Sequence, residues 1–451
     1  MPAAALPRAV LSNLSVGIVG AGIGGLATAV GLAGRGFKRV TVYESAPEVG
    51  EVGAGIQVAP NFCRVLSHFG VFDRLKAQAV RLEGANVRRY SDNETINSTS
   101  FASLEKEFGA PTYVVHRADL HQALLDRALE LGATLQTNAH VENVDFDKTL
   151  LKLRGQPALS HDLIIAADGI KSGIRSQMMA RRGEVDETIP TGEAAYRSGT
   201  EGTDRRTYRY PLDRRVDSPS SLACTNARTD PRSDIPLGPD AHVVAYPIKA
   251  QNAFNIVTTH ISNTVGLTED WTARASKDIM LKRFEGWTET LLKCLRLAPP
   301  GELVEWALRI HLPLTGWIDG NTVLLADAAH ATLPHIAQGA AQAGEDAAVL
   351  STLLAKCQSK EEVPAALRMY EKLRKPRADW AVEMARITGE NLHMADGAAQ
   401  KARDEALKRA ATGGKSPDRW GDKETQRRLY GLDVVKQADQ EYARLWTSSP
   451  L

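Results

Sequence analysis

The chain has 451 residues, about three times the ~150 residues of a typical single domain, so we expect at least two structural units. Hydrophobic residues make up 43% of the sequence and charged residues 24%, which excludes a disordered, collagen-like or coiled-coil protein. The 55 Lys and Arg residues nearly balance the 54 Asp and Glu residues, so the net charge of +1 gives no electrostatic basis for binding nucleic acid or an anionic membrane.

The cysteines and the apolar stretches indicate a reducing compartment and no membrane anchor. Four cysteines lie far apart without a C-x-x-C motif, which argues against a disulfide scaffold or a zinc module: Cys63, Cys224, Cys294 and Cys357. The longest apolar stretch, 16–33, is divided by glycines and followed by Arg35 and Lys38. It therefore predicts a strand, a turn and a helix rather than a membrane span. We expect a soluble, cytoplasmic protein.

The first elements form a predicted strand–helix–strand unit with a dinucleotide-binding turn. A strand over 15–19 and a helix over 25–35 precede a strand over 39–44. Between the first strand and the helix stands a G-x-G-x-x-G motif formed by Gly20, Gly22 and Gly25. Such a turn lets the backbone approach a pyrophosphate at the helix N-terminus. Glu44 follows at the end of the second strand, where a carboxylate accepts hydrogen bonds from ribose hydroxyls. The pattern therefore predicts a site for FAD or NAD and disfavours NADP there.

Two helices and a second strand–turn motif continue this unit. Apolar residues recur at helical spacing over 61–78 and over 118–131. The run Leu-Ile-Ile-Ala-Ala over 163–167 predicts a buried strand, and Asp168 begins the Asp-Gly turn that follows it. A carboxylate in that turn is a candidate cofactor contact, although strand–Asp–Gly turns are common on their own.

The middle of the chain predicts a different kind of structure. Residues 200–240 are rich in Arg, Asp, Ser and Pro, so we expect loops and edge strands there. Residues 242–248 and 253–260 alternate like antiparallel strands, which predicts a sheet inserted between two parts of the first unit. His242 and Tyr246 lie four residues apart on one of these strands, an even spacing that places both side chains on one face.

A third motif follows the predicted inserted sheet. A buried strand over 323–325 ends just before Asp327, and a Gly/Ala-rich helix extends from about 339 to 356. A carboxylate at a strand end suits ribityl hydroxyls. The helix N-terminus near Gly339 offers N–H groups to a flavin ring, where it would stabilise the negative charge that develops at N1 on reduction.

These three motifs, in this order, resemble those of the class A flavoprotein aromatic monooxygenases over about residues 15–380. The finer resemblance is to the salicylate hydroxylase and 6-hydroxynicotinate 3-monooxygenase branch, especially its fungal members. It rests on the segments AAYR, HVVAYPI and PHIAQG at 194–197, 242–248 and 334–339. The resemblance implies non-covalent FAD, reduction by NADH or NADPH, and hydroxylation of a phenolic ring by O2 through a flavin C4a-hydroperoxide.

The resemblance also implies an α/β fold of the p-hydroxybenzoate hydroxylase type. We expect a Rossmann-like FAD-binding domain at 1–190 with a return segment at 313–358, and an inserted antiparallel-sheet substrate domain at 191–312. A C-terminal helical region is expected at 359–451. Its aromatic residues indicate either helical packing or the face of a homodimer: Trp380, Trp420 and Trp446.

The resemblance implies FAD contacts at Glu44, Gly53, Ala54, Arg117, Asp327 and Ala340. Gly53 and Ala54 would lie beside the isoalloxazine ring, and Arg117 would face the pyrophosphate. The chain departs from the family pattern twice: Ala326 stands where the family has Gly before Asp327, and Ala337 stands where it has Gly before the following Gln.

The substrate side of the reaction has four candidate residues: His335, His242, Tyr246 and Arg197. In the relatives the positions of the first three face the substrate, where they deprotonate or polarise the phenol. Arg197 is a candidate anchor for a carboxylate or phenolate. Sheet packing is the alternative for His242 and Tyr246, and surface solvation for Arg197, while His330 is expected to be a packing residue. The eleven histidines show no metal-ligand spacing, so no metal site is predicted.

The leading hypothesis is an FAD-dependent hydroxylase of a small phenolic acid such as salicylate or a hydroxybenzoate, with CO2 released if attack falls on the carboxylate-bearing carbon. The alternative within enzymes is a monooxygenase of a larger phenolic, polyketide or indole secondary metabolite. A non-enzyme alternative resembles the GDP dissociation inhibitors, which lack a functional flavin site; Asp327 and the helix after it argue against this. The expected partners are the aromatic substrate, O2 and NAD(P)H, with no nucleic acid and no membrane.

Overall fold

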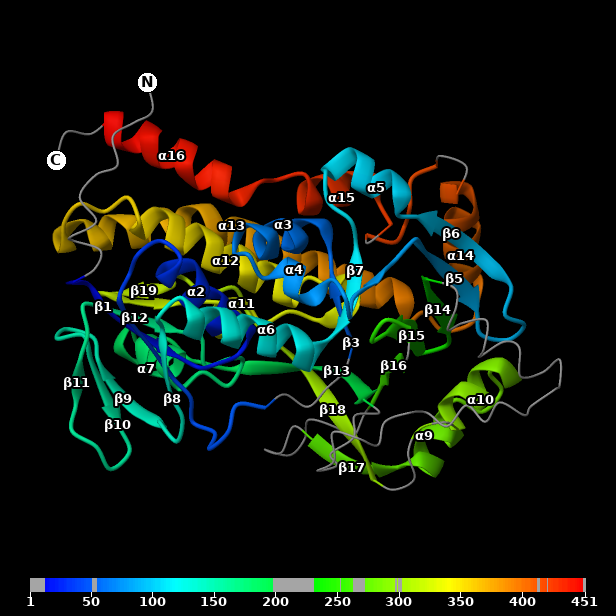
Figure 1. Cartoon of the computed structure of the whole chain (residues 1–451). Helices are drawn as coiled ribbons and strands as arrows, with labels where there is room; N and C mark the ends of the chain where they lie inside the picture. The colour runs from blue at the N-terminus through cyan, green and yellow to red at the C-terminus, as the bar shows by residue number, and fades with distance from the viewer. Residues whose placement is uncertain are drawn as a thin grey trace.

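The computed structural model describes residues 13–50, 55–197, 231–251, 253–262, 272–296, 298, 302–411, 414–419 and 421–448. A parallel sheet with its helices forms the left-hand part of the view in Figure 1, and a larger mixed sheet forms the right-hand part. Long helices lie above both sheets in this view. Within the described ranges, no helix combines the length and the apolar character that crossing a lipid bilayer requires.

The first sheet has six strands in the order β19-β20-β12-β1-β2-β8. The five strands from β20 to β8 are parallel to one another, and only β19 runs antiparallel to its neighbour β20. The strands are β1 (Ser15–Val19), β2 (Arg39–Tyr43), β8 (Thr134–Gln136), β12 (Leu163–Ala166), β19 (Ile318–Asp319) and β20 (Thr322–Leu324). The predicted strand–helix–strand unit forms the centre of this sheet, with the turn between β1 and the next helix at the carboxyl edge.

Two buried helices line this sheet. Every residue of α2 (Ile23–Ala33) is buried, because its Gly, Ala and Leu residues leave the helix apolar on all sides. It packs against α12 (Gly339–Leu354), which also contacts three further helices: α3 (Pro60–His68), α13 (Val363–Leu392) and α16 (Val434–Ser448). The helix α2 also contacts α6 (Arg117–Glu130). The third motif therefore packs directly on the first.

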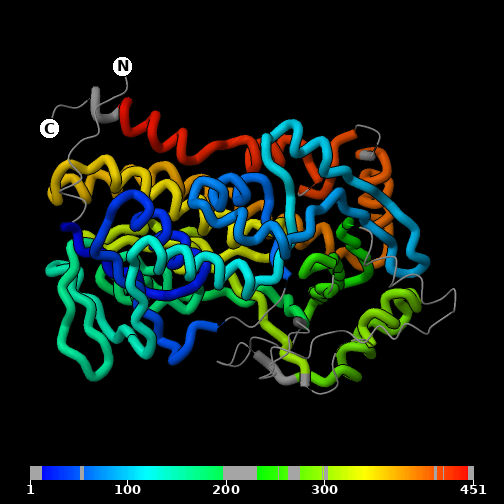
Figure 2. Tube along the Cα trace, viewed as in Figure 1, coloured from blue at the N-terminus to red at the C-terminus, as the bar shows by residue number. Residues whose placement is uncertain are grey.

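The second sheet has eight strands in the order β17-β18-β13-β16-β15-β14-β5-β6, antiparallel throughout except where β14 runs parallel to β5. They are β5 (Gly84–Arg89), β6 (Thr95–Ser100), β13 (Thr188–Arg197), β14 (Arg232–Gly238), β15 (Ala241–Ile248), β16 (Ala253–Ile261), β17 (Thr272–Ser276) and β18 (Glu302–His311). The sheet expected at 191–312 thus also takes in two strands from 84–100. Figure 2 shows the chain crossing to the right-hand half in green and returning to the left-hand half in yellow-green.

Smaller elements complete the fold. Two three-stranded sheets comprise β3 (Gly55–Val58), β4 (Val80–Arg81) and β7 (Tyr113–His116), and β9 (Val141–Asp145), β10 (Leu150–Leu153) and β11 (Leu159–Ser160). The remaining helices are α4 (Phe72–Leu75), α5 (Ala102–Phe108), α7 (Gly173–Arg181), α9 (Lys277–Arg283), α10 (Glu289–Arg296), α11 (Asp327–His330), η1 (Pro334–Ile336), η2 (Lys360–Glu362), α14 (Ala398–Ala411) and α15 (Lys423–Tyr430).

The helix predicted over 61–78 is wrong in one respect, because the structure divides it into α3 and α4. Gly70 adopts a positive φ of 67° between them, a left-handed conformation that ends a helix. The other predicted helices and strands of the first unit begin and end within a few residues of the observed ones.

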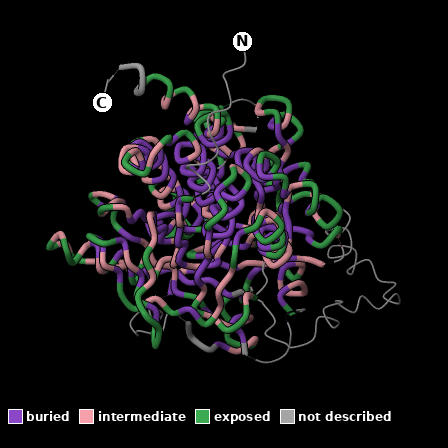
Figure 3. Tube along the Cα trace, turned by 60° about the vertical axis from the view of Figure 1, so that its left-hand side comes forward, coloured by how far each residue is buried: buried purple, intermediate pink, exposed green. Residues whose placement is uncertain are grey.

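The hydrophobic core has three main parts, one formed by the parallel sheet with its helices and one on each face of the mixed sheet. The part facing α13 includes Leu333 and Ile336 beside η1, together with Tyr246 of β15. The opposite face packs on α9 and α10. Figure 3 shows the buried segments concentrated in the middle of the molecule. By contrast, α16 lies at the surface, where its described residues bury only Val434 and Ala438.

Candidate active site

The glycine turn after β1 is shaped by close backbone contacts. Gly20 has a φ of +100°, and a Cβ on Gly25 would lie 2.0 Å from the Gly20 carbonyl oxygen, so the turn requires glycine at both positions. Gly22 differs: a Cβ there would meet no atom within 4 Å. The space beside Gly22, at the N-terminus of α2, is therefore open to a ligand.

Glu44 is fixed beside this turn. Its Oε2 accepts a hydrogen bond from the Ala21 N–H at 2.8 Å, and its Oε1 accepts one from the Ala46 N–H at 2.9 Å. The carboxylate is half-buried. The acid predicted at the end of β2 thus lies next to the turn, where the remaining acceptor sites of its carboxylate are available to ribose hydroxyls.

Asp327 begins α11, just after β20. Its side chain is exposed, yet the protein atoms packed around it desolvate the carboxyl group and raise its pKa, while the charges of His330 and Arg117 act in the opposite direction. Arg117 begins α6. The turn before Asp327 touches α2, because a Cβ on Gly24 would lie 2.7 Å from the Cβ of Ala326. The carboxylate and the glycine turn therefore belong to one site.

These features fit FAD. The open space at Gly22 suits a pyrophosphate, and Glu44 and Asp327 supply carboxylates for ribose and ribityl hydroxyls. The helix predicted near 339 begins at Gly339, so the N–H groups of Gly339 and Ala340 have no partner within α12 and remain available to a flavin ring. Contact of each of these residues with FAD stays a prediction.

The two departures from the family pattern fall at left-handed backbone positions. Ala326 has φ 58° and ψ −138°, and Ala337 has φ 52° and ψ 39°. Glycine adopts such angles without strain, whereas a Cβ makes them costly. This explains why the family pattern has glycine at both positions, and it means that neighbouring groups hold the two alanines in place.

A buried ionic network holds the first of these turns. Asp346 on α12 accepts a hydrogen bond from the Ala326 N–H at 3.0 Å, and its Oδ2 lies 2.6 Å from His330 Nε2. Arg374 on α13 bonds both Asp346 and Glu345, at 2.7 Å and 2.6 Å. Burial opposes ionisation of Asp346, but His330 and Arg374 outweigh it and lower the pKa of this carboxyl. His330, expected to be a packing residue, therefore fixes the loop that carries Asp327.

A second buried cluster joins the mixed sheet to η1 and α13. His335 Nε2 lies 2.9 Å from Glu193 Oε2, and Glu193 Oε1 lies 3.0 Å from His393 Nδ1. His393 Nε2 in turn lies 2.7 Å from His242 Nδ1. The cluster brings together two of the predicted substrate residues, His335 and His242, with two residues that were not predicted.

The electrostatics of this cluster favour an ionised Glu193 that accepts hydrogen bonds from the rings of His335 and His393. Burial opposes ionisation of Glu193, but hydrogen bonds from His335 and His393 outweigh it and lower its pKa to about 2. Burial, followed by the neighbouring His393 and His335, lowers the pKa of His242 well below its usual value. His335 Nδ1 is buried and has no hydrogen-bond partner among the described residues.

The other candidate residues have different surroundings. Tyr246 lies on the same face of β15 as His242 and packs beside η1, and a Cβ on Gly55 would lie 2.5 Å from its ring. Asp168 accepts hydrogen bonds from Ser172 Oγ and the Ile174 N–H at the start of α7, and burial raises the pKa of its carboxyl. Its contact with a cofactor stays a prediction. Gly53, Ala54 and the side chain of Arg197 lie outside the described residues.

Sequence reasoning missed Glu193, His393 and Asp346. Glu193 and His393 are 200 residues apart in the chain, and neither stands in a recognisable motif. Asp346 lies seven residues after Gly339 on a helix that is buried along its length, so an acid at that position could have been read as one that needs a partner. Among the described residues, no group of His, Cys, Asp or Glu has the geometry of a metal site.

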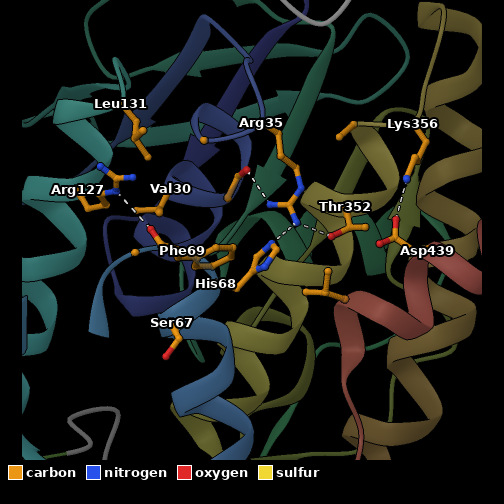
Figure 4. Close-up of a pocket in the computed structure, with 15 residues that line it drawn as sticks. Val30, Arg35, Ser67, His68, Phe69, Arg127, Leu131, Thr352, Lys356 and Asp439 are labelled. Atoms are coloured by element: carbon orange, nitrogen blue, oxygen red, sulfur yellow. Dashed lines mark hydrogen bonds and ion pairs between the residues drawn. The ribbon is translucent and has the colours of Figure 1, made fainter. Parts of the chain in front are cut away.

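A separate cleft of about 570 Å³ lies at the opposite end of α2 (Figure 4). Arg35 reaches across it to His68 Nε2 and Thr352 Oγ1, at 2.9 Å and 2.7 Å, and also bonds the Gly31 carbonyl near the end of the helix. Lys356 pairs with Asp439 of α16 at 2.7 Å. These contacts close the C-terminal end of α2 and tie α12 to α16, and they lie away from the glycine turn.

Comparisons with known proteins identify relatives of this chain. The family described as FAD binding domain matches residues 13–196 and 303–385, which omits most of the inserted sheet. The chain is 36% identical to the FAD-dependent monooxygenase atnJ of Arthrinium sp, over 90% of this chain and 92% of that one. It is 30% identical to the 3-hydroxybenzoate 6-hydroxylase of Polaromonas naphthalenivorans (strain CJ2), over 94% and 97%. Its fold is similar to that of a salicylate hydroxylase in complex with its substrate, with a TM-score of 0.73, 23% identity and coverage of 95% and 98%.

Proposed function

Since this chain belongs to the FAD-binding family of flavoprotein aromatic monooxygenases, we propose that it hydroxylates a small phenolic acid such as a hydroxybenzoate or salicylate. FAD is its cofactor, and a reduced nicotinamide coenzyme and O2 are the co-substrates typical of the family. A 3-hydroxybenzoate hydroxylase among its relatives supports a phenolic acid as the substrate class.

The buried pair of Glu193 and His335 is the observation that carries this proposal. His335 lies in η1, two residues before the left-handed Ala337 and four before the N-terminus of α12, and it is bonded to Glu193 on β13. Hydroxylation at an aromatic carbon requires an electron-rich ring, and the ring of a phenolate carries more electron density than that of a phenol. We assign the phenol proton to His335 Nδ1, because this nitrogen is buried without a partner among the described residues while Nε2 is bonded to a carboxylate.

The remaining residues of the site bind and orient. Glu44, Asp327 and the N-termini of α2 and α12 hold the cofactor. Tyr246, on the same face of β15 as His242, is positioned to orient the ring. Arg197, the last residue of β13, would supply a cation to anchor the carboxylate of the substrate. When bound and reduced, FAD supplies the activation of O2 and the electrophilic oxygen.

A substrate panel tests this proposal. Hydroxybenzoates, hydroxynicotinates and larger phenols are incubated with the FAD-loaded enzyme and NAD(P)H, and coenzyme oxidation is matched to hydroxylated product. We expect stoichiometric product from at least one hydroxybenzoate, and His335→Ala should slow hydroxylation by ~10²–10⁴ while FAD stays bound. Turnover of a large phenol alone would replace the proposal with the secondary-metabolite alternative.

The fate of the carboxyl group is tested in the same assay. We propose attack at the carbon that bears the carboxylate, because a phenolate ortho or para to it directs electron density there and loss of CO2 restores the aromatic ring. With carboxyl-labelled hydroxybenzoates, we expect the label to be released as CO2. Label retained in a dihydroxybenzoate would show that hydroxylation occurs without decarboxylation.

A further inference from the structure

The cluster around His335 contains more groups than a single base requires. Glu193 lies on β13, His242 on β15, His335 in η1 and His393 at the C-terminal end of α13, so four separate elements converge. The approach of α13 depends on a glycine, because a Cβ on Gly389 would lie 2.7 Å from His335 Nε2. Hydrogen bonds of 2.7–3.0 Å join these four side chains, so the cluster is held rigidly.

One carboxylate fixes the position of the proton on each of the three rings. An ionised Glu193 can only accept hydrogen bonds, so His335 Nε2 and His393 Nδ1 must both carry hydrogen. With hydrogen on Nδ1 of His393, its Nε2 is the nitrogen left to accept a hydrogen bond. Because that nitrogen lies 2.7 Å from His242 Nδ1, the hydrogen of the third ring is on Nδ1.

The same chain of hydrogen bonds determines which nitrogen of His335 is basic. With hydrogen on Nε2, the lone pair is on Nδ1, the one ring atom of His335 that lacks a partner within the described structure. Without the carboxylate, the two tautomers of His335 would compete, and the Nδ1–H form cannot accept a proton from a phenol.

We propose that Glu193 and His393 are positioning residues: Glu193 holds His335 in the Nε2–H tautomer with its Nδ1 lone pair free for the substrate, and His393, bonded to His242, fixes the orientation of that carboxylate. This inference rests on the proposed function, in which His335 takes the phenol proton. It extends the site to two residues outside the flavin motifs, Glu193 on β13 and His393 at the C-terminal end of α13.

The proton balance is simple. The O–H bond of the phenol breaks, its proton binds to His335 Nδ1, and the electron pair stays on the phenolate oxygen. The hydrogen on Nε2 of His335 remains in place, and its hydrogen bond to Glu193 restricts the orientations that the imidazolium ring can adopt. Glu193 stays ionised and stabilises the cation, so no proton passes beyond His335.

The first test reads the tautomers directly, without turnover. ¹⁵N chemical shifts of histidine-labelled, FAD-loaded enzyme at neutral pH should show His335 with hydrogen on Nε2, and His393 and His242 with hydrogen on Nδ1. Glu193→Gln should change at least the first two assignments, because an amide both donates and accepts. Glu305→Gln is the matched control: Glu305 is a buried partner of His260 at 2.7 Å on the opposite face of the same sheet, so this variant should leave the three rings unchanged.

The second test uses kinetics. We expect Glu193→Gln to lower kcat for hydroxylation by at least ~10² while KM and FAD content stay within about twofold, and His393→Gln, which can still donate to Glu193, to cause a smaller loss. Glu305→Gln should behave as wild type. Thermal unfolding separates these losses from misfolding, and His393→Gln keeps the test open if Glu193→Gln does not fold.

The outcomes distinguish the two proposals. If His335→Ala is inactive but Glu193→Gln retains full activity and wild-type tautomers, the positioning role is wrong and the proposed function stands. If no phenol is hydroxylated by the wild type, the proposed function fails, and the ¹⁵N shifts still decide whether Glu193 sets the tautomers. Hydrogen on Nδ1 of His335 in the wild type would overturn the inference outright.

Discussion

At the scale of single residues, the glycine turn separates positions that the fold needs from a position that the ligand needs. A Cβ at residue 25 would collide with the backbone of residue 20, whereas a Cβ at Gly22 would meet no protein atom within 4 Å. The same motif therefore contains glycines with two different purposes, and substitution distinguishes them.

Gly22→Ala should leave the apoprotein as stable as wild type and weaken FAD roughly tenfold to a hundredfold. The methyl group occupies the space where the pyrophosphate must accept charge-assisted hydrogen bonds of ~1.5–3 kcal/mol. FAD titration of the apoprotein by fluorescence quenching measures the affinity, and thermal unfolding measures the stability. Gly25→Ala is the contrasting variant, expected to destabilise the apoprotein itself by ~1–3 kcal/mol or more because α2 must shift. Equal effects of the two substitutions on the apoprotein would contradict this distinction.

Asp327→Ala should weaken FAD to a similar extent, since it removes a charge-assisted hydrogen bond of ~1.5–3 kcal/mol. The apoprotein should not lose stability, because desolvation by the surrounding protein atoms raises the pKa of this carboxyl, so the charged side chain is a cost to the unliganded fold. Equilibrium dialysis of FAD against wild-type and variant apoprotein measures the change. A variant that binds FAD with wild-type affinity would remove Asp327 from the cofactor site.

The residues that could be predicted from the sequence are those whose role is local. The glycine turn, Glu44 and Asp327 stand at fixed offsets from strands and helices, so short-range pattern was sufficient to place them. Glu193 and His393 could not be found in this way, because their partnership is created by the packing of α13 on the mixed sheet. His335 and His242 were predicted from the resemblance, but their connection through His393 was not.

At the scale of elements, α12 is held to its neighbours by buried charge as well as by apolar contact. Glu345 and Asp346 are adjacent, fully buried carboxylates on α12, and Arg374 and Arg377 of α13 are their cationic partners. A buried charge that loses its partner is strongly destabilising. The position of the loop before α12 therefore depends on α13, which contributes no residue to the flavin motifs.

Arg374→Met should destabilise the protein by ~3–5 kcal/mol, because it leaves the carboxylates of Glu345 and Asp346 undercompensated in the interior. FAD should also be retained less well, since Asp346 bonds the Ala326 N–H just before Asp327. Urea unfolding gives the stability change. Lys375→Met, which alters only a partly exposed pair with Asp379, is the control and should cost less than ~0.5 kcal/mol. If the two variants lose the same stability, the buried network is not what holds α12.

At the scale of the whole molecule, the buried histidine cluster makes the protein sensitive to acid. The folded state lowers the pKa of His242. Below the usual histidine pKa of ~6.5 the unfolded chain therefore binds more protons than the folded protein, and the free energy of unfolding decreases as the pH decreases. Glu193, with a folded pKa of about 2 against a usual value of 4.5, adds a second loss below pH ~4.5. Both effects have the same sign.

We therefore expect the melting temperature to be highest near neutral pH and to fall as the pH decreases from ~6.5. His242→Gln removes one titrating group and should flatten the decrease between pH 7 and pH 5.5 relative to its own value at pH 8. His140→Gln, at an exposed position, should leave the slope unchanged. A scan of melting temperature against pH for the three proteins measures this, and parallel curves would show that His242 contributes nothing to the acid response.

The order of strands in the parallel sheet also has a consequence for biosynthesis. β20 pairs with β12, yet 155 residues of chain lie between them. At ~5–20 residues per second, a ribosome takes roughly 8–30 s to cover that interval. During this time the β12 edge of the nascent sheet has no partner, and unpaired strand edges attract other chains. Chaperone demand during translation should therefore peak between the emergence of β12 and that of β20, and a ribosome pause inside the inserted sheet should increase aggregation more than one placed after α12.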